Sequence, residues 1–336
     1  MLQILIQSFL SILSLELLPI DPAYYEYKAG LRNFPPAAIS GVHHFPKSVL
    51  AGNQLDLQAH QTADRSLATT IPSEIIIPTK VKDANFGPFI SSKHAVIFDL
   101  SSGYALYAKD GGTPAPIGSI TKLVAGLVFV RLNPELTGTV MIKEVDQDYN
   151  GKNYLPLYQN ISAKDVLAAS LVGSDNTATN ALAKLVRLTE TEYVERMNNL
   201  ASELGLNDSH FTDLTGLSAD NKASARDVAW AYYQVSREPI LRPYLAANQW
   251  TLTSTRSPIT VNSTNEIYRN NYQLRDFAIE GGKTGYIPAA GYCFVSQFVK
   301  DDHEILVVVL GADSKPSRFE DSLLLADWAY DSFIWP

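Results

Sequence analysis

Short apolar runs bounded by turn residues predict β-strands in two separate parts of the chain. In the first part, residues 94–100 and 104–108 flank a Ser-Ser-Gly turn. In the second part, residues 277–285, 291–299 and 304–310 are rich in β-branched and aromatic residues. We therefore expect five strands, two near residue 100 and three near the C-terminus.

Between these two parts the apolar residues recur at helical spacing. Residues 177–188 and 190–204 follow the 3.6-residue period, and residues 318–333 form an amphipathic helix after the last strand. Residues 122–130 are apolar on every side, which predicts a helix buried inside a domain. The order predicts an α+β fold, with an antiparallel five-stranded sheet flanked by helices and an inserted all-helical subdomain at about residues 131–250.

The N-terminal part of the chain has no such pattern, apart from an apolar run at residues 1–20. This run lacks a basic n-region and a small-residue cleavage site, and it is shorter and more polar than a typical membrane span. It is therefore an export signal or anchor, an ordinary hydrophobic helix, or a misassigned start. Prolines and scattered polar residues predict an irregular linker over residues 21–85, with a short strand at residues 74–77. We expect the folded domain to span residues 86–336.

Composition excludes several classes of function. The net charge of -8 is dispersed along the 336 residues, which argues against a nucleic-acid-binding surface. The single cysteine, Cys293, lies in a predicted buried strand and excludes an intramolecular disulfide. No spacing of cysteine and histidine is typical of zinc binding, so we expect no metal.

Three short strings, in this order along the chain, together describe a serine acyl-transfer site. They are Ser119-Ile-Thr-Lys122, Ser174-Asp-Asn176 and Lys283-Thr-Gly285. Each string alone arises readily by chance. Here they fall at the start of the buried helix, in a loop between helices and on a strand, which makes coincidence a minor alternative.

The residue types in the first two strings suit nucleophilic catalysis. Serine is a good nucleophile only when a base removes its proton. Lys122 lies on the same helical face as Ser119, and burial together with the nearby cation Lys283 would keep its amine neutral. Ser174 is suited to relay a proton to a leaving amine, and Asn176 can hold both a substrate amide and the lysine.

The third string is suited to hold the substrate. Lys283 provides a charge, Thr284 a hydroxyl for a carboxylate, and Gly285 a close approach for a substrate backbone along an edge strand. We expect the backbone N–H groups of Ser119 and Tyr286 to bind the oxyanion.

With these strings the chain resembles the serine penicillin-binding proteins, in particular the low-molecular-mass D-alanyl-D-alanine carboxypeptidases and endopeptidases. The resemblance begins near residue 92, continues to the C-terminus, and includes residues 96–103, 204–211, 216–217, 224–227 and 262–270. It implies a β-lactamase/transpeptidase-like fold, with Ser119 as the acylated nucleophile and Lys122 as the general base. Arg318 follows the last strand, where the family often has an arginine near the substrate carboxylate.

The resemblance also implies the partners of this chain. The substrates would be peptidoglycan stem peptides ending in D-Ala-D-Ala, or cross-links between them, and β-lactams would be inhibitors. The site would then face outside the cytoplasm, in the periplasm or at the cell surface, and any membrane attachment would depend on residues 1–20. The resemblance implies no cofactor.

Two alternatives remain open. A class A β-lactamase shares the fold and adds a Glu-x-x-Leu-Asn string, which Glu203-Leu-Gly-Leu-Asn207 matches literally. That string falls inside the peptidase-like stretch and follows Asn176 too closely, so we interpret Glu203 as an ordinary helix residue. The other alternative is a non-catalytic cell-wall-binding protein, which would not need Lys122.

Overall fold

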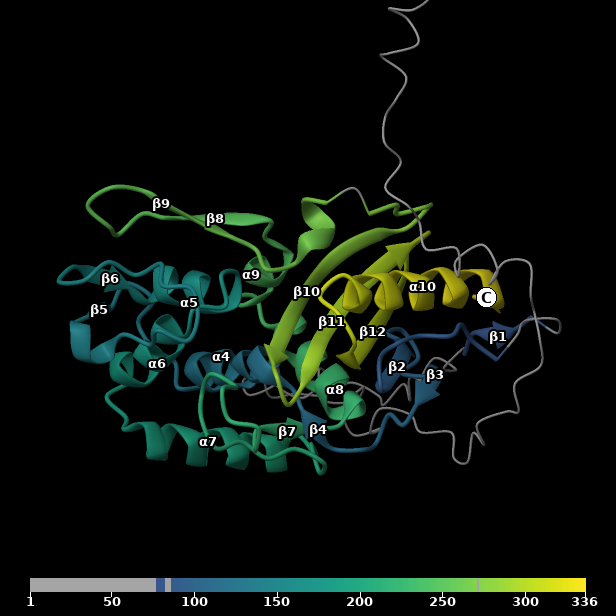
Figure 1. Cartoon of the computed structure of the whole chain (residues 1–336), viewed down its shortest axis with the longest axis horizontal. Coiled ribbons are helices and arrows are strands. Elements are labelled where there is room, and N and C mark those ends of the chain that lie inside the picture. Colours follow the sequence, from purple (N-terminus) through teal and green to yellow (C-terminus); the bar gives the residue numbers. More distant parts are fainter. Residues whose placement is uncertain (1–76, 82–85, 271) are drawn as a thin grey trace, which may run out of the picture. The chain divides into compact units, whose positions relative to one another are not determined.

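A five-stranded antiparallel sheet organises the described part of the chain (Figure 1). The computed structural model describes residues 77–81, 86–270 and 272–336. The strand order is β10, β11, β12, β2, β3. The strands are β2 (His94–Asp99), β3 (Ala105–Lys109), β10 (Ala278–Ile287), β11 (Gly291–Lys300) and β12 (His303–Ala312). The predicted α+β class and five-stranded sheet are confirmed, and β10 lies at an edge.

Side chains of the sheet alternate between two hydrophobic cores. In β2, Val96 and Phe98 belong to one core, whereas Ala95 and Ile97 belong to the other. Helix α10 (Ser317–Ser332) covers the second core, and helices from the middle of the chain contribute to the first. Because successive strand residues point to opposite faces, a sheet covered on both sides needs apolar residues at nearly every position. This explains the continuous apolar runs in the sequence.

Helix α4 (Lys122–Arg131) is surrounded by other helices. Every residue from Lys122 to Phe129 is buried. The helix contacts α5 (Ala163–Leu171), α6 (Asn176–Leu185), α7 (Glu190–Glu203) and α8 (Ala225–Arg237). A short helix, α9 (Arg242–Ala246), follows α8. Because α4 has neighbours on all sides, it has no polar face, as its sequence predicts.

Short elements connect the helices and the sheet. Three strand pairs are β4 (Ala115–Pro116) with β7 (Lys222–Ala223), β5 (Thr139–Met141) with β6 (Asn160–Ser162), and β8 (Gln249–Leu252) with β9 (Ile259–Asn262). The 3-10 turns of the described ranges are η2 (Gly118–Thr121), η3 (Glu144–Asp146) and η4 (Glu266–Tyr268). The β4–β7 pair holds the chain immediately before Ser119, and η2 leads directly into α4.

The two helix starts with a Ser-x-x-Asp string are capped by their serines. Ser162 Oγ accepts a hydrogen bond from Asp165 N, and Ser224 Oγ accepts one from Asp227 N, both at 3.2 Å. The carboxylate of Asp165 accepts from Ser254 N at 2.7 Å, and that of Asp227 accepts from the loop after α7. The aspartates therefore tie the helix starts to remote loops, in addition to the caps that the serines provide.

Most of the N-terminal predictions lie outside the described residues. These include the apolar run at residues 1–20 and residues 74–76 of the expected strand. Within the range predicted as a linker, β1 (Thr79–Lys80) pairs with β13 (Phe333–Ile334). Among the helices of the described ranges, none combines the length and apolar character needed to cross a bilayer. The domain boundaries stay predictions.

Candidate active site

The amine of Lys122 lies next to the hydroxyl of Ser119. Ser119 is in turn η2, and Lys122 begins α4, where its side chain is fully buried. Lys122 Nζ is 3.0 Å from Ser119 Oγ, 2.8 Å from Asn176 Oδ1 and 2.6 Å from the carbonyl oxygen of Thr215. The first and second strings therefore meet at one nitrogen atom.

Burial favours the neutral form of the Lys122 amine. Removal from water lowers the pKa of its ammonium to about 7, although the carboxylates of Asp213, Asp175 and Asp148 act in the opposite direction. Close to neutral pH a large fraction of Lys122 is therefore uncharged. The main cause is burial of the amine, rather than the charge of a second lysine.

Ser174 meets the lysine of the third string. Lys283 Nζ donates to Ser174 Oγ at 2.8 Å and to the carbonyl oxygen of Thr284 at 3.0 Å. Ser174 has φ +60°, a left-handed conformation that is rare for residues other than glycine. Burial, and then the charges of Lys122 and Arg318, lower the pKa of Lys283 well below its usual value. The site thus holds two buried amines, each beside a serine hydroxyl.

The edge strand β10 and Arg318 form the other side of the site. Thr284 Oγ1 is 2.7 Å from Thr264 Oγ1, and Arg318 Nη1 donates to the carbonyl oxygen of Gly285 at 3.2 Å. The buried Nε of Arg318 has no hydrogen-bond partner among the described residues. A buried guanidinium with a free donor is suited to bind a carboxylate.

Two glycines allow backbone segments around Ser119 to touch. A Cβ atom on Gly118 would lie 2.7 Å from Tyr286 N, and one on Gly216 would lie 2.0 Å from the carbonyl oxygen of Gly118. Both glycines have positive φ, which also favours glycine. The turn that carries Ser119 therefore packs between the backbone of Gly216 on one side and the backbone N–H of Tyr286 on the other.

We expect Gly216→Ala to lower the free energy of unfolding by about 2–4 kcal/mol, because the new methyl group meets backbone atoms that cannot move aside easily. Gly205→Ala is the matched control. Gly205 also has a positive φ, +71°, but a Cβ there would meet nothing within 4 Å. Gly205→Ala should lower the free energy of unfolding by about 1 kcal/mol, because only the backbone conformation is unfavourable for alanine. Urea denaturation measures both, and equal losses would show that the close contact at Gly216 is unimportant.

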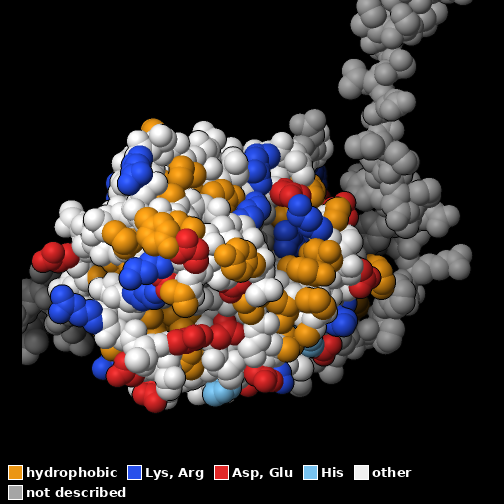
Figure 2. Space-filling model, turned by 60° about the vertical axis from the view of Figure 1, so that its left-hand side comes forward, with side chains coloured by type: hydrophobic (Ala, Val, Ile, Leu, Met, Phe, Trp, Pro, Cys, Tyr) orange, Lys and Arg blue, Asp and Glu red, His pale blue; other side chains and the backbone are white. Residues whose placement is uncertain are grey.

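A pocket of about 220 Å³ opens over Ser119. Its lining consists of Ser119, Lys152, Ser174, Thr264, Glu266, Arg269, Thr284, Gly285, Tyr286, Lys315 and Arg318. Four of these side chains are basic and one is acidic, although the chain as a whole is acidic. Figure 2 shows Lys and Arg side chains gathered around a hollow on one face. Within the described ranges, no group of His, Cys, Asp and Glu side chains is arranged to hold a metal ion.

The structure brings all the predicted site residues into this region, and it adds others. Lys152, Thr264, Glu266, Arg269 and Lys315 line the pocket without belonging to the three strings. Only the segment at residues 262–270 carries a signal in the sequence, through its resemblance to the family. The charged side chains from separate segments have no shared pattern that would identify them.

The carbonyl group of Thr215 is a further addition. The carboxylate of Asp213 accepts from Thr215 N at 2.6 Å, from Thr215 Oγ1 at 2.7 Å and from Gly216 N at 2.7 Å. These bonds fix the loop so that the Thr215 carbonyl faces Lys122. A backbone carbonyl has no side-chain signature, so this contact cannot be found in the sequence.

Glu203 lies outside the pocket. Its exposed carboxylate is 4.0 Å from Nη1 of Arg131, the last residue of α4. Lys122 is the first residue of that helix, roughly 14 Å away along its axis. The Glu-x-x-Leu-Asn string therefore places no carboxylate beside Ser119, and Glu203 is an ordinary helix residue.

Comparisons with known proteins agree with this geometry. Residues 80–314 match the family described as D-alanyl-D-alanine carboxypeptidase. The chain is 27% identical over 275 residues to the D-alanyl-D-alanine endopeptidase of Escherichia coli (strain K12), covering 80% of this chain and 87% of that protein. It is 29% identical over 259 residues to the D-alanyl-D-alanine carboxypeptidase DacD of the same organism. This match covers 73% of this chain and 65% of that protein.

A likeness to solved structures supports the fold. The DD-transpeptidase of Streptomyces K15 superimposes with a TM-score of 0.66 at 23% identity, covering 73% of this chain and 99% of that one. The transpeptidase-like fold expected from the sequence is thus confirmed.

Proposed function

The chain belongs to the D-alanyl-D-alanine carboxypeptidase family of peptidases, and we propose that it cleaves peptidoglycan stem peptides through an acyl-enzyme on Ser119. The observation that carries this proposal is the set of partners around Lys122 Nζ. Asn176 Oδ1 and the Thr215 carbonyl can only accept hydrogen bonds. In the neutral amine they take both hydrogens, so the lone pair is left to face the hydroxyl of Ser119.

Acylation then follows from the positions of these groups. The Lys122 amine takes the proton of Ser119, and Oγ attacks the carbonyl carbon of the substrate. The oxyanion forms between the N–H groups of Ser119 and Tyr286, whose segments are in contact at Gly118. When the C–N bond breaks, Ser174 relays to the leaving amine the proton that Lys122 took from Ser119, with Lys283 holding the Ser174 hydroxyl in place, so that Lys122 is neutral again.

Deacylation releases the shortened peptide. Water attacks the ester carbonyl and gives its proton to the neutral amine of Lys122, which passes it to Ser119 Oγ as the bond between Oγ and the carbonyl carbon breaks. Thr284 and Arg318 hold the carboxylate of the leaving residue until it departs, since Arg318 presents a free buried donor.

β-Lactams would acylate the same serine and turn over slowly, because Glu203 is too distant to activate water.

The leaving group can be a terminal D-alanine or a cross-linked strand. Relatives from Escherichia coli, Pseudomonas aeruginosa and Haemophilus influenzae that cover most of this chain are named D-alanyl-D-alanine endopeptidases. Others are named carboxypeptidases. We infer that this chain is a carboxypeptidase that can also act as an endopeptidase.

Such substrates place the enzyme outside the cytoplasm, in the periplasm or at the cell surface. Residues 1–20 are the part of the chain proposed to export or anchor it. Expression in cells with and without these residues, followed by fractionation, tests this role. Recovery of both forms in the same fraction would contradict it.

The proposed reaction predicts two products. Incubation with monomeric stem peptides ending in D-Ala-D-Ala should release D-alanine, and incubation with cross-linked dimers should release monomers, both followed by mass spectrometry. Penicillin should label the protein covalently, and the label should be lost slowly by hydrolysis. Rapid β-lactam hydrolysis without peptide cleavage would instead identify a β-lactamase. Absence of both labelling and cleavage would favour a non-catalytic binding protein.

A further inference from the structure

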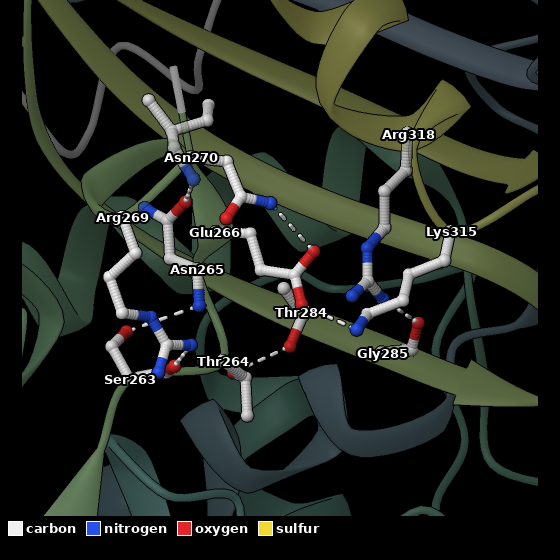
Figure 3. A network of polar contacts seen from close by, with 11 residues as sticks. Ser263, Thr264, Asn265, Glu266, Arg269, Asn270, Thr284, Gly285, Lys315 and Arg318 are labelled. Atoms are coloured by element: carbon white, nitrogen blue, oxygen red, sulfur yellow. Dashed lines mark hydrogen bonds and ion pairs between the residues drawn. The ribbon is translucent and has the colours of Figure 1, made fainter. Parts of the chain in front are cut away.

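An ion pair crosses the pocket above the proposed substrate strand. Glu266 begins η4, in the segment after β9, and Lys315 lies in the turn between β12 and α10. Their side chains form an ion pair, and both line the pocket. Figure 3 shows them reaching toward each other over Thr284 and Gly285 of β10, beside Arg318. The pair therefore connects two walls of the pocket across its floor.

The charges around this pair are unbalanced. Among the described residues that line the pocket, Glu266 is the only acid, and it pairs with Lys315. For the other basic lining residues, Lys152, Arg269 and Arg318, the described ranges contain no carboxylate within ion-pair distance. Of these three, Arg318 lies directly beside the Glu266–Lys315 pair, and its buried Nε has no hydrogen-bond partner among the described residues, so it is the one suited to bind a substrate carboxylate.

The backbone around Glu266 is fixed, whereas its ion pair is partly exposed. Thr264 N donates to the Val172 carbonyl at 3.2 Å, and Asn265 Oδ1 accepts from Ile267 N at 3.1 Å. In contrast, 54% of the Lys315 side chain is exposed, against 22% of the Glu266 side chain, so Lys315 is the partner that can swing into solvent. Partly exposed pairs contribute little stability and are weakened by salt. This pair can therefore open by side-chain rotation alone, at small cost.

We propose that the Glu266–Lys315 ion pair is a gate at the leaving-group end of the pocket, and that it selects the size of the leaving group. This inference rests on the proposed function. With the pair closed, the space beside Arg318 ends after one small residue, such as a terminal D-alanine. With the pair open, the leaving residue can continue into a second peptide, as in a cross-link. The hydrolysis is the same in both cases.

The test compares two substrates on the same enzyme. The ratio of kcat/KM for a cross-linked dimer to kcat/KM for a monomeric D-Ala-D-Ala peptide is measured for wild type, Glu266→Gln and Lys315→Met. Both substrates carry a free carboxylate on the leaving residue, so that the loss of one charge affects them alike. We expect the ratio to rise about fivefold in each variant, a change within the range of a partly exposed ion pair. The charge exchange Glu266→Lys with Lys315→Glu should bring it back toward wild type.

A matched control separates the gate from a general effect of charge. Lys300→Met breaks the ion pair of Lys300 with Asp276, which does not line the pocket, and should leave the ratio unchanged. Raising the salt concentration should increase the ratio for wild type and have less effect on the two variants, because salt screens the intact pair.

The outcomes distinguish the gate from the proposed function. If the wild type cleaves neither peptide and is not labelled by penicillin, the proposed function fails. If the wild type cleaves the monomer and both variants keep the wild-type ratio, or lower it, the gate is overturned while the function stands. A rise that the charge exchange does not reverse also overturns the gate.

Discussion

Ser119→Ala should abolish covalent labelling by penicillin and reduce D-alanine release by roughly 10⁴-fold or more, the loss typical of a removed nucleophile. Ser119 Oγ is 3.0 Å from the amine of Lys122 at the start of α4, which is placed to take its proton. Without this oxygen no ester can form. Mass spectrometry of the intact protein after incubation with penicillin measures the loss directly.

The control for this experiment is another serine. Ser257 is exposed in the loop between β8 and β9, away from the pocket lining, so Ser257→Ala should label like wild type. The Ser119→Ala protein should also unfold at an unchanged temperature, since only one partly exposed oxygen is removed. Labelling of Ser119→Ala at the wild-type stoichiometry would show that another residue is acylated.

The rate of acylation should rise with pH through about 7 and level off above it. Lys122 accepts the serine proton only as the neutral amine, and burial lowers the pKa of its ammonium to about 7. Below that pH the amine is protonated and the reaction slows. Lys122→Met should lower the acylation rate by about 10³-fold, within the range of a lost general base. Stopped-flow labelling between pH 5 and 9, as an approximate range, measures both effects.

Lys222 provides the control for this experiment. Its side chain is about half exposed and lies outside the pocket, so Lys222→Met should keep both the rate and the pH profile. If Lys122→Met retained the wild-type pH step, the titration would belong to another group. Lys283 would then be the first candidate, because its pKa is also strongly lowered by burial.

The elements of the fold were predictable because their patterns are local. The apolar runs at residues 94–100 and 304–310 predicted buried strands, and both pair in the sheet. The all-apolar helix predicted at residues 122–130 is the buried α4. The short strand pairs were not predicted, because two to four residues are too few to show a period.

The literal match at Glu203 shows where local pattern fails. Its string fits a β-lactamase, yet the side chain is exposed at the end of α7 and pairs with Arg131. Whether a carboxylate can activate water depends on its distance from the reacting serine. That distance is set by the packing of α7 against α4, which the string does not contain.

The sequence by itself determined the residue types of the site and their order. Ser119 and Lys122 stand one helical turn apart, so their contact follows from local geometry. The tertiary structure decided the rest, because long-range packing brings the other groups together. It buries Lys122 and so lowers its pKa, and it places the Thr215 carbonyl beside the amine. It also pairs Glu266 with Lys315 across the pocket, although they lie 49 positions apart in the sequence.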